Sequence, residues 1–271
     1  MTIKFRNRMT LVLFIISVSW LIMGLFFTLF QFFSTNLVLP EVYTKGLSDN
    51  FFLRYSPICV FIGLLVIILY VCITTLIIYH SFEKTQAPDI VFFLLFLIAC
   101  LCDTSRILVP IFQLSGTFSF FLLRVGNIHL FARLLAPLAL MGNTILSTDD
   151  FRQNTDRSTI ILIIVSMFFA EIIPLNTAVI LPNFCISYGY VKAIRGFSLL
   201  ICIVSTISLF YTNHKNEYKQ IMTIGFILLC LGYALIFFSY NIASLVAGTI
   251  LLGTGTYLYL NEVHKHYLWI D

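Results

Sequence analysis

The stretch IVFFLLFLIACLCDTSRILVPIF, residues 90–112, joins an unbroken apolar run to a carboxylate and a guanidinium. As a helix that rises 1.5 Å per residue, it is long enough to cross the roughly 30 Å hydrocarbon core of a membrane. Similar apolar runs recur along the whole chain, which is 60% hydrophobic and 10% charged, with a mean hydropathy of +1.00. A soluble domain needs a polar surface that this composition does not supply. The sequence therefore predicts a polytopic membrane protein in contact with the lipid bilayer.

Eight membrane spans are predicted, and each should be helical because the bilayer core offers no water to backbone groups. No interval between them has room for a soluble domain, so residues 1–271 are expected to form one all-α, membrane-embedded helix bundle. The last two spans are joined so tightly, at 239–241, that seven spans is an alternative. The predicted spans are residues 9–33, 56–80, 90–113, 118–146, 159–181, 196–212, 220–239 and 242–263.

The distribution of basic residues predicts the orientation of the bundle. If the N-terminus is cytoplasmic, nine Lys and Arg residues flank the spans on that side and four on the other, which is the bias that sets topology. The apolar run after the basic N-terminal residues is too long for a cleaved signal peptide and is interpreted as a retained anchor. Both termini are thus predicted on the inner side of a bacterial cytoplasmic membrane.

Ionisable residues lie deep inside three of the predicted spans. Asp103 and Arg106 are three residues apart and share a helix face. His129 lies one turn before Arg133 in the fourth span, and Glu171 falls near the middle of the fifth. With a neutral histidine their charges sum to zero, which matters because one unpaired charge at the bilayer centre costs at least about 2.5–3.5 kcal/mol. We therefore expect spans three, four and five to pack around a cluster at the midplane.

Prolines accompany this predicted cluster. Pro110 and Pro137 each come four residues after one of its arginines, in the related phrases RILVPIF (106–112) and RLLAPLA (133–139), and Pro174 comes three after its glutamate. A helical proline frees the carbonyl four residues earlier, and broken helices at the midplane build solute or ion sites in many transporters. Paired charges can equally lock helices together while neighbours satisfy the freed carbonyls. Both interpretations, a functional site and a static polar core, stay open.

Small residues recur in the last two spans at spacings that let helices approach closely. They predict tight packing between these spans, with a homo-oligomer contact as the alternative. The GTGT at 253–256 is not a phosphate loop, because no Lys-Ser/Thr follows and no strand precedes it. The predicted packing residues are Gly225, Gly232, Ala243, Ala247, Gly248 and Gly253.

The remaining patterns argue against several classes of protein. No nucleophile and base stand at a useful spacing, and no HExxH, Cys/His zinc pattern or phosphate loop is present, so no enzyme activity, metal or cofactor is expected. The basic residues lie at helix ends and not in a patch, which disfavours nucleic acid as a partner. A disulfide between Cys59 and the loop residue Cys185 is not favoured either.

Two functions fit what is left. Minimal loops, the lack of catalytic motifs and a charge-neutral cluster favour a ligand-responsive (sensory) or assembly module that acts through a membrane or cytoplasmic partner protein. In architecture alone, the chain resembles the multi-helix membrane input modules of bacterial regulators. The alternative is a secondary transporter of a small charged or zwitterionic solute. In that case Arg106 and Arg133 would meet an anionic group, and Asp103 or Glu171 would take a cation or proton.

Overall fold

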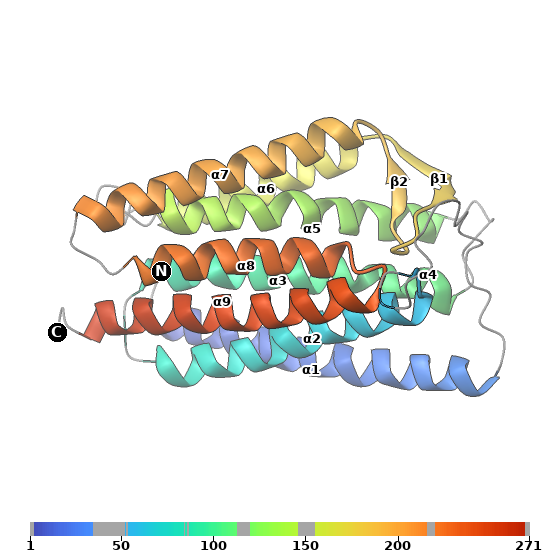
Figure 1. Cartoon of the computed structure of the whole chain (residues 1–271), viewed down its shortest axis with the longest axis horizontal. Coiled ribbons are helices and arrows are strands. Elements are labelled where there is room, and N and C mark those ends of the chain that lie inside the picture. Colours follow the sequence, from blue (N-terminus) through green and yellow to red (C-terminus); the bar gives the residue numbers. More distant parts are fainter. Residues whose placement is uncertain are drawn as a thin grey trace.

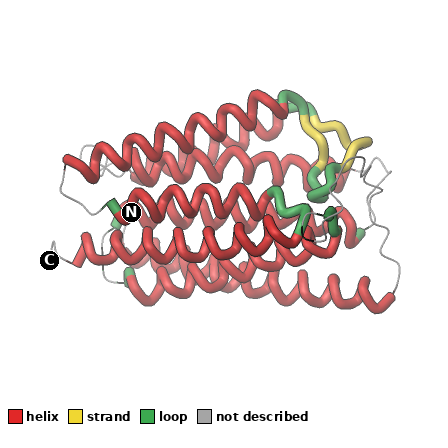
Figure 2. The backbone as a smooth tube through the Cα atoms, in the orientation of Figure 1, coloured by secondary structure: helices red, strands yellow, loops and turns green. Residues whose placement is uncertain are grey.

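The chain folds into a bundle of long antiparallel helices with one β-hairpin at its end (Figures 1 and 2). The helices are α1 (Ile3–Ser34), α2 (Pro57–Ser81), α3 (Pro88–Asp103), η1 (Thr104–Ile107), α4 (Leu108–Ile111), α5 (Phe120–Ile145), α6 (Thr155–Ile172), α7 (Val191–Lys215), α8 (Ile221–Phe237) and α9 (Ile242–Leu268), and the strands are β1 (Leu175–Ile180) and β2 (Ile186–Tyr188). This computed structural model describes residues 3–34, 52, 54–83, 85, 87–112, 120–145, 155–215 and 220–268.

Six helical segments in the described residues are long and apolar enough to cross a membrane, and the 17-residue α8 is apolar but shorter. The all-α membrane helix bundle is the fold that the composition predicts. The count of eight spans and the orientation remain predictions. Both termini lie at one end of the bundle and the hairpin at the other (Figure 1). Arg6 lies at the end with the termini, and Lys192 and Arg195 lie at the hairpin end, in the first turns of α7.

The central helix is α3, which explains its uniformly apolar sequence. In the most apolar part of the segment from α3 through α4, 83% of the residues are buried inside the protein, against 22% in the most apolar part of α1. A helix that is hydrophobic all round has no polar face to turn outward, so it fits the middle of a bundle. It packs most extensively against α5, while α1 packs mainly on α2. Pro88 opens α3 at a position where its missing N–H costs no helical hydrogen bond.

The predicted fifth span, 159–181, is wrong in its second half. The helix α6 ends at Ile172, and residues 175–180 form strand β1, which pairs antiparallel with β2. Pro174 therefore does not lie inside a helix. It follows the helix end and its carbonyl accepts a hydrogen bond from Gly189 N at 2.8 Å, closing the base of the hairpin. Pro137, in contrast, lies inside α5 as predicted.

Helices α8 and α9 pack against each other more extensively than any other pair of described elements. A Cβ at Gly232 would lie 2.3 Å from Leu252 N, and one at Gly225 would lie 2.9 Å from Tyr259 N, so the two backbones are in direct contact. Gly248 is also in the interface, because a Cβ at this position would lie 2.7 Å from Ile236 Cγ1. These contacts follow the predicted packing of the last two spans.

Three of the predicted packing residues face elsewhere. Ala243, Ala247 and Gly253 are exposed, and a Cβ at Gly253 would meet nothing within 4 Å. The physical reason is helical phase: the stripe of α9 that meets α8 runs through Gly248 and Gly255, and a neighbouring residue in sequence is turned about 100° away from it. Gly255, whose Cβ would lie 2.4 Å from Leu229 N, is the contact glycine in place of Gly253.

Candidate functional site

The turn of the β-hairpin folds into the end of the bundle. Asn183, Phe184 and Cys185 are each at most 2% exposed. Two backbone hydrogen bonds close the turn, from Leu181 N to Cys185 O (2.7 Å) and from Phe184 N to Leu181 O (2.9 Å). Phe184 has φ 62°, a left-handed conformation that is rare for a bulky residue, and its ring packs on Phe61 of α2 with 4.9 Å between centroids. The turn is therefore a fixed structure that places Cys185 inside the protein.

Asp103 is fully buried beneath this turn and joins two elements. Its Oδ2 accepts a hydrogen bond from Arg106 Nη2 at 2.9 Å, and its Oδ1 lies 2.8 Å from His129 Nδ1. In the 3₁₀ turn η1, side chains three residues apart nearly eclipse, which aligns Arg106 with Asp103. Pro110 favours this turn, because it lacks the N–H that would bond the Arg106 carbonyl in an α-helix. The predicted pair of Asp103 and Arg106 is thus present, and His129 joins it.

Cys185 completes what we call the buried cluster: Asp103, Arg106, His129 and Cys185. Arg106 Nη1 donates to Cys185 Sγ (3.4 Å) and to Asn183 O (3.2 Å). His129 also interacts with the thiol. Burial raises the pKa of the Cys185 thiol, but the charges of His129 and Arg106 act against it, so the net pKa is below its ordinary value. Nearby cations stabilise the thiolate, which is the nucleophilic form of cysteine.

Three basic side chains, those of Arg106, His129 and Arg133, pack against the ring of Phe237. Arg133 Cζ lies 4.1 Å from its centroid and Arg106 Cζ 4.7 Å, while the His129 ring stacks on it at 5.7 Å with an interplanar angle of 12°. Phe237 is the last residue of α8, and the C-terminal end of a helix carries partial negative charge. The aromatic face and the helix end therefore both favour positive charge at this point.

Arg133 has no carboxylate partner among the described residues. Its Nε is buried without a hydrogen-bond partner, although the side chain as a whole is partly exposed. Arg195 of α7 approaches the same place: its Cζ lies 5.3 Å from the centroid of Phe238, and Arg133 Cζ lies 5.6 Å from that centroid. We call Arg133 and Arg195 the arginine pair. Among the described residues, the site thus holds more positive charge than the predicted, balanced cluster.

Glu171 does not belong to the site. Its two carboxylate oxygens bind Arg124 Nη1 (2.9 Å) and Asn127 Nδ2 (3.0 Å), and both Glu171 and Arg124 are about half exposed, at 49% and 50%. The early end of α6 is the reason. Because the helix stops at Ile172, Glu171 lies in its last turn, opposite the first turns of the antiparallel α5, and not halfway along a span opposite Arg133. The predicted cluster therefore loses its second carboxylate.

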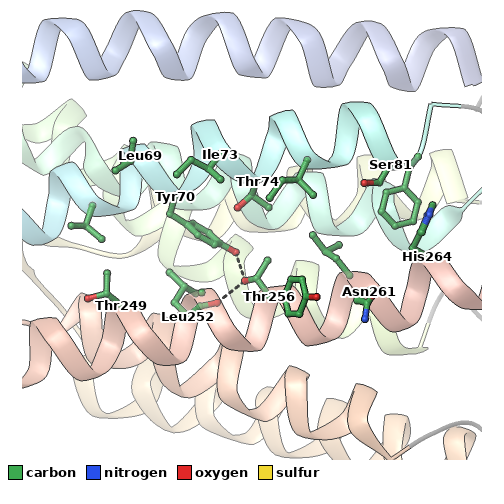
Figure 3. Close-up of a pocket in the computed structure, with 16 residues that line it drawn as sticks. Leu69, Tyr70, Ile73, Thr74, Ser81, Thr249, Leu252, Thr256, Asn261 and His264 are labelled. Carbon is green, nitrogen blue, oxygen red and sulfur yellow. Dashed lines mark hydrogen bonds between the residues drawn. The ribbon is translucent and has the colours of Figure 1, made fainter.

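The depth of the cluster also differs from the prediction. The sequence placed it at the midplane, whereas residues of the hairpin turn contact Arg106 directly and so set the cluster toward the hairpin end. Two cavities lined by described residues lie away from it. One of about 360 Å³ opens between α2 and α9, where Tyr70 and Thr256 join their hydroxyls at 2.8 Å (Figure 3). The other, of about 510 Å³, lies between α1, α3 and α6.

Comparison of the chain with protein-family models, curated proteins and solved structures found no match. No group of three metal-binding side chains occurs in the part of the chain that the structure describes. Cys59 and Cys185 are both free thiols. The sequence did not predict Cys185, Arg195 or Phe237 as site residues. The one local signal for the turn was Pro182-Asn183, a dipeptide typical of turns.

Proposed function

We propose that this protein is a ligand-responsive membrane module whose ligand carries negative charge, and that it acts through a partner protein. The observation that carries the proposal is the unbalanced charge of Arg133. The one carboxylate of the buried cluster, Asp103, is already taken by Arg106 and His129, and Glu171 is taken by Arg124. Among the described residues, the guanidinium of Arg133 thus has no anionic partner, although it lies within an apolar bundle.

The aromatic contact of Arg133 does not replace an anionic partner. Phe237 covers the face of the guanidinium, but an aromatic ring accepts no hydrogen bonds from the N–H groups in the guanidinium plane. The buried Nε is one such donor without a partner. A carboxylate or phosphate group would supply the acceptors in the geometry that arginine prefers. Arg195, directed at the neighbouring Phe238, would add a second positive charge to the same ligand.

The test is the thermal stability of the purified full chain in detergent, with phosphate or succinate compared against chloride at equal ionic strength. A ligand that binds only the folded state raises Tm, so we expect an increase of a few degrees for the wild type and none for Arg133→Met. The matched control is Arg124→Met, which removes a guanidinium outside the site and should keep the response. Equal responses in both variants, or no response in the wild type to either anion, would contradict the proposal.

The partner is tested separately. Extraction from native membranes at native abundance in mild detergent should release the protein together with a second chain. Recovery of a single homogeneous species would contradict this part of the proposal.

The second candidate is secondary transport of a small anionic or zwitterionic solute by the same arginines. Pro137 favours it, because a helix break one turn after Arg133 lets α5 bend at the site. Transport requires a water path to Arg133, which sensing does not. In an Arg133→Cys variant, whose new thiol stands at a partly exposed position of the site itself, a membrane-impermeant thiol reagent added from one side should label the cysteine if the protein is a transporter. A thiol that is unreactive from both sides, beside a reactive surface cysteine control, would exclude transport.

A further inference from the structure

Asp103, His129 and Cys185 form a chain of contacts in space: the carboxylate contacts the imidazole, and the imidazole interacts with the thiol. A carboxylate only accepts hydrogen bonds, so the contact of 2.8 Å between Asp103 Oδ1 and His129 Nδ1 places the proton on Nδ1 whenever the imidazole is neutral. The other nitrogen, Nε2, then carries the lone pair. It is buried, has no hydrogen-bond partner of ordinary geometry, and belongs to a ring that interacts with the Cys185 thiol. This is the relation of a base to a nucleophile.

Arg106 adds an electrostatic contribution to this arrangement. Its Nη1 lies 3.4 Å from Cys185 Sγ, while its Nη2 is anchored on Asp103. The guanidinium of Arg106 thus contacts two groups at once. One is the sulfur of Cys185, and the other is the carboxylate of Asp103, which orients the imidazole. Among the described residues, Tyr188 of β2 and Tyr240, which follows α8, are further titratable groups close enough to interact electrostatically with the thiol.

We propose that Cys185 is a reactive thiol, modified by small neutral oxidants of the peroxide class, with His129 as its base and Arg106 stabilising the thiolate. This inference goes beyond the proposed function and does not require the anionic ligand. Four observations support it together: the closed turn that fixes the sulfur, the oriented imidazole, the free lone pair and the guanidinium beside the sulfur.

The reaction with hydrogen peroxide balances with these groups alone. His129 Nε2 takes the proton of the thiol, and the thiolate sulfur attacks one oxygen of the peroxide. A sulfur–oxygen bond forms, the oxygen–oxygen bond breaks, and the leaving hydroxide takes the proton back from the imidazolium to give water. Cysteine is oxidised by two electrons to sulfenic acid, and the peroxide is reduced to water.

Burial explains why the proposed reactant is small and neutral. Cys185 is 1% exposed, and neither of the two cavities described above is lined by it. Hydrogen peroxide needs little space and carries no charge, so its entry into a protein interior costs far less than entry of a bulky or charged reagent. The arrangement therefore selects the peroxide over charged alkylating reagents.

The experiment treats the full chain, in membranes or detergent, with hydrogen peroxide, and traps sulfenic acid with a cyclic diketone for mass spectrometry of each cysteine. Cys185 should be trapped, and Cys59 is the internal control, because it is also a free, buried thiol. We expect His129→Gln to slow the trapping at Cys185 about 100-fold at neutral pH. The deficit should shrink at high pH, where the thiol ionises without a base.

The pH profile separates a base from a merely structural histidine. A folding defect would not be repaired by high pH, and the melting temperature of the variant shows whether it is folded. Asp103→Asn keeps an oxygen for His129 Nδ1 and is the second variant should His129→Gln unfold. It should slow the trapping as well. The proposal is overturned if Cys185 reacts no faster than Cys59 in the folded wild type, or if a folded His129→Gln reacts at the wild-type rate.

Discussion

Replacing Arg106 by Met is expected to lower the free energy of unfolding by about 3–5 kcal/mol. The guanidinium is 2% exposed and makes hydrogen bonds to Asp103, to Cys185 and to the carbonyl of Asn183. Its removal leaves the fully buried Asp103 with His129 as its one hydrogen-bond partner among the described residues, and removes the polar contact that ties the hairpin turn to the bundle. An isolated buried charge is far more costly than a buried ion pair or no charge at all.

The double variant distinguishes a pair from two independent residues. Asp103→Asn with Arg106→Met removes both charges, and we expect it to recover a large part of the stability lost in the single variants. Arg124→Met with Glu171→Gln is the matched control, because that pair is half exposed and should be worth only about 0–1 kcal/mol. Stability is measured by thermal or denaturant unfolding in one detergent. A single Arg106→Met variant as stable as wild type would show that the pair does not hold the hairpin.

The contrast between these two pairs shows what the sequence could predict. Asp103 and Arg106 are three residues apart in one helical segment, so local spacing was enough to predict their contact. The partner of Glu171 depends on where α6 ends, and the sequence of this region does not separate helix from strand. The run from 159 to 181 is apolar almost throughout, and such a run fits a membrane helix and a buried hairpin equally well. Pro174 was interpreted as a kink, whereas it marks the helix end.

Cys185 could not be predicted for a different reason. Its contacts come from His129 of α5 and Arg106 of η1, residues that lie more than 50 positions away along the chain, and the approach depends on the turn that buries Phe184. Helical periodicity contains no information about such contacts. The same limit applies to Phe237, whose role arises because α8 ends beside α5. Composition therefore predicted the membrane bundle, and local spacing predicted one ion pair, but the site itself is a product of tertiary packing.

Replacing Gly232 by Ala is expected to destabilise the protein by about 1–3 kcal/mol, although alanine is the better helix former. A Cβ at this position would lie 2.3 Å from Leu252 N and 2.7 Å from Leu252 Cα. Both are backbone atoms, so no rotamer change can relieve the clash and the whole of α9 has to move away from α8. Loss of close packing along this pair is the direct cost, since membrane helices associate mainly through such contacts.

Gly253→Ala is the control, because Gly253 also lies inside a helix, α9, but faces away from the α8–α9 interface. Nothing lies within 4 Å of a Cβ at Gly253, so this change should raise stability by a few tenths of a kcal/mol to about 1 kcal/mol through helix propensity. Unfolding of both variants in the same detergent shows directly whether each change lowers or raises the free energy of unfolding. Phe237 lies little more than one turn beyond Gly232, so a displaced α8 should also move the ring from His129 and Arg133. Gly232→Ala should therefore weaken the anion response of the arginine pair, whereas Gly253→Ala should leave it unchanged. Equal stability of the two variants would mean that the α8–α9 interface tolerates separation and does not position Phe237.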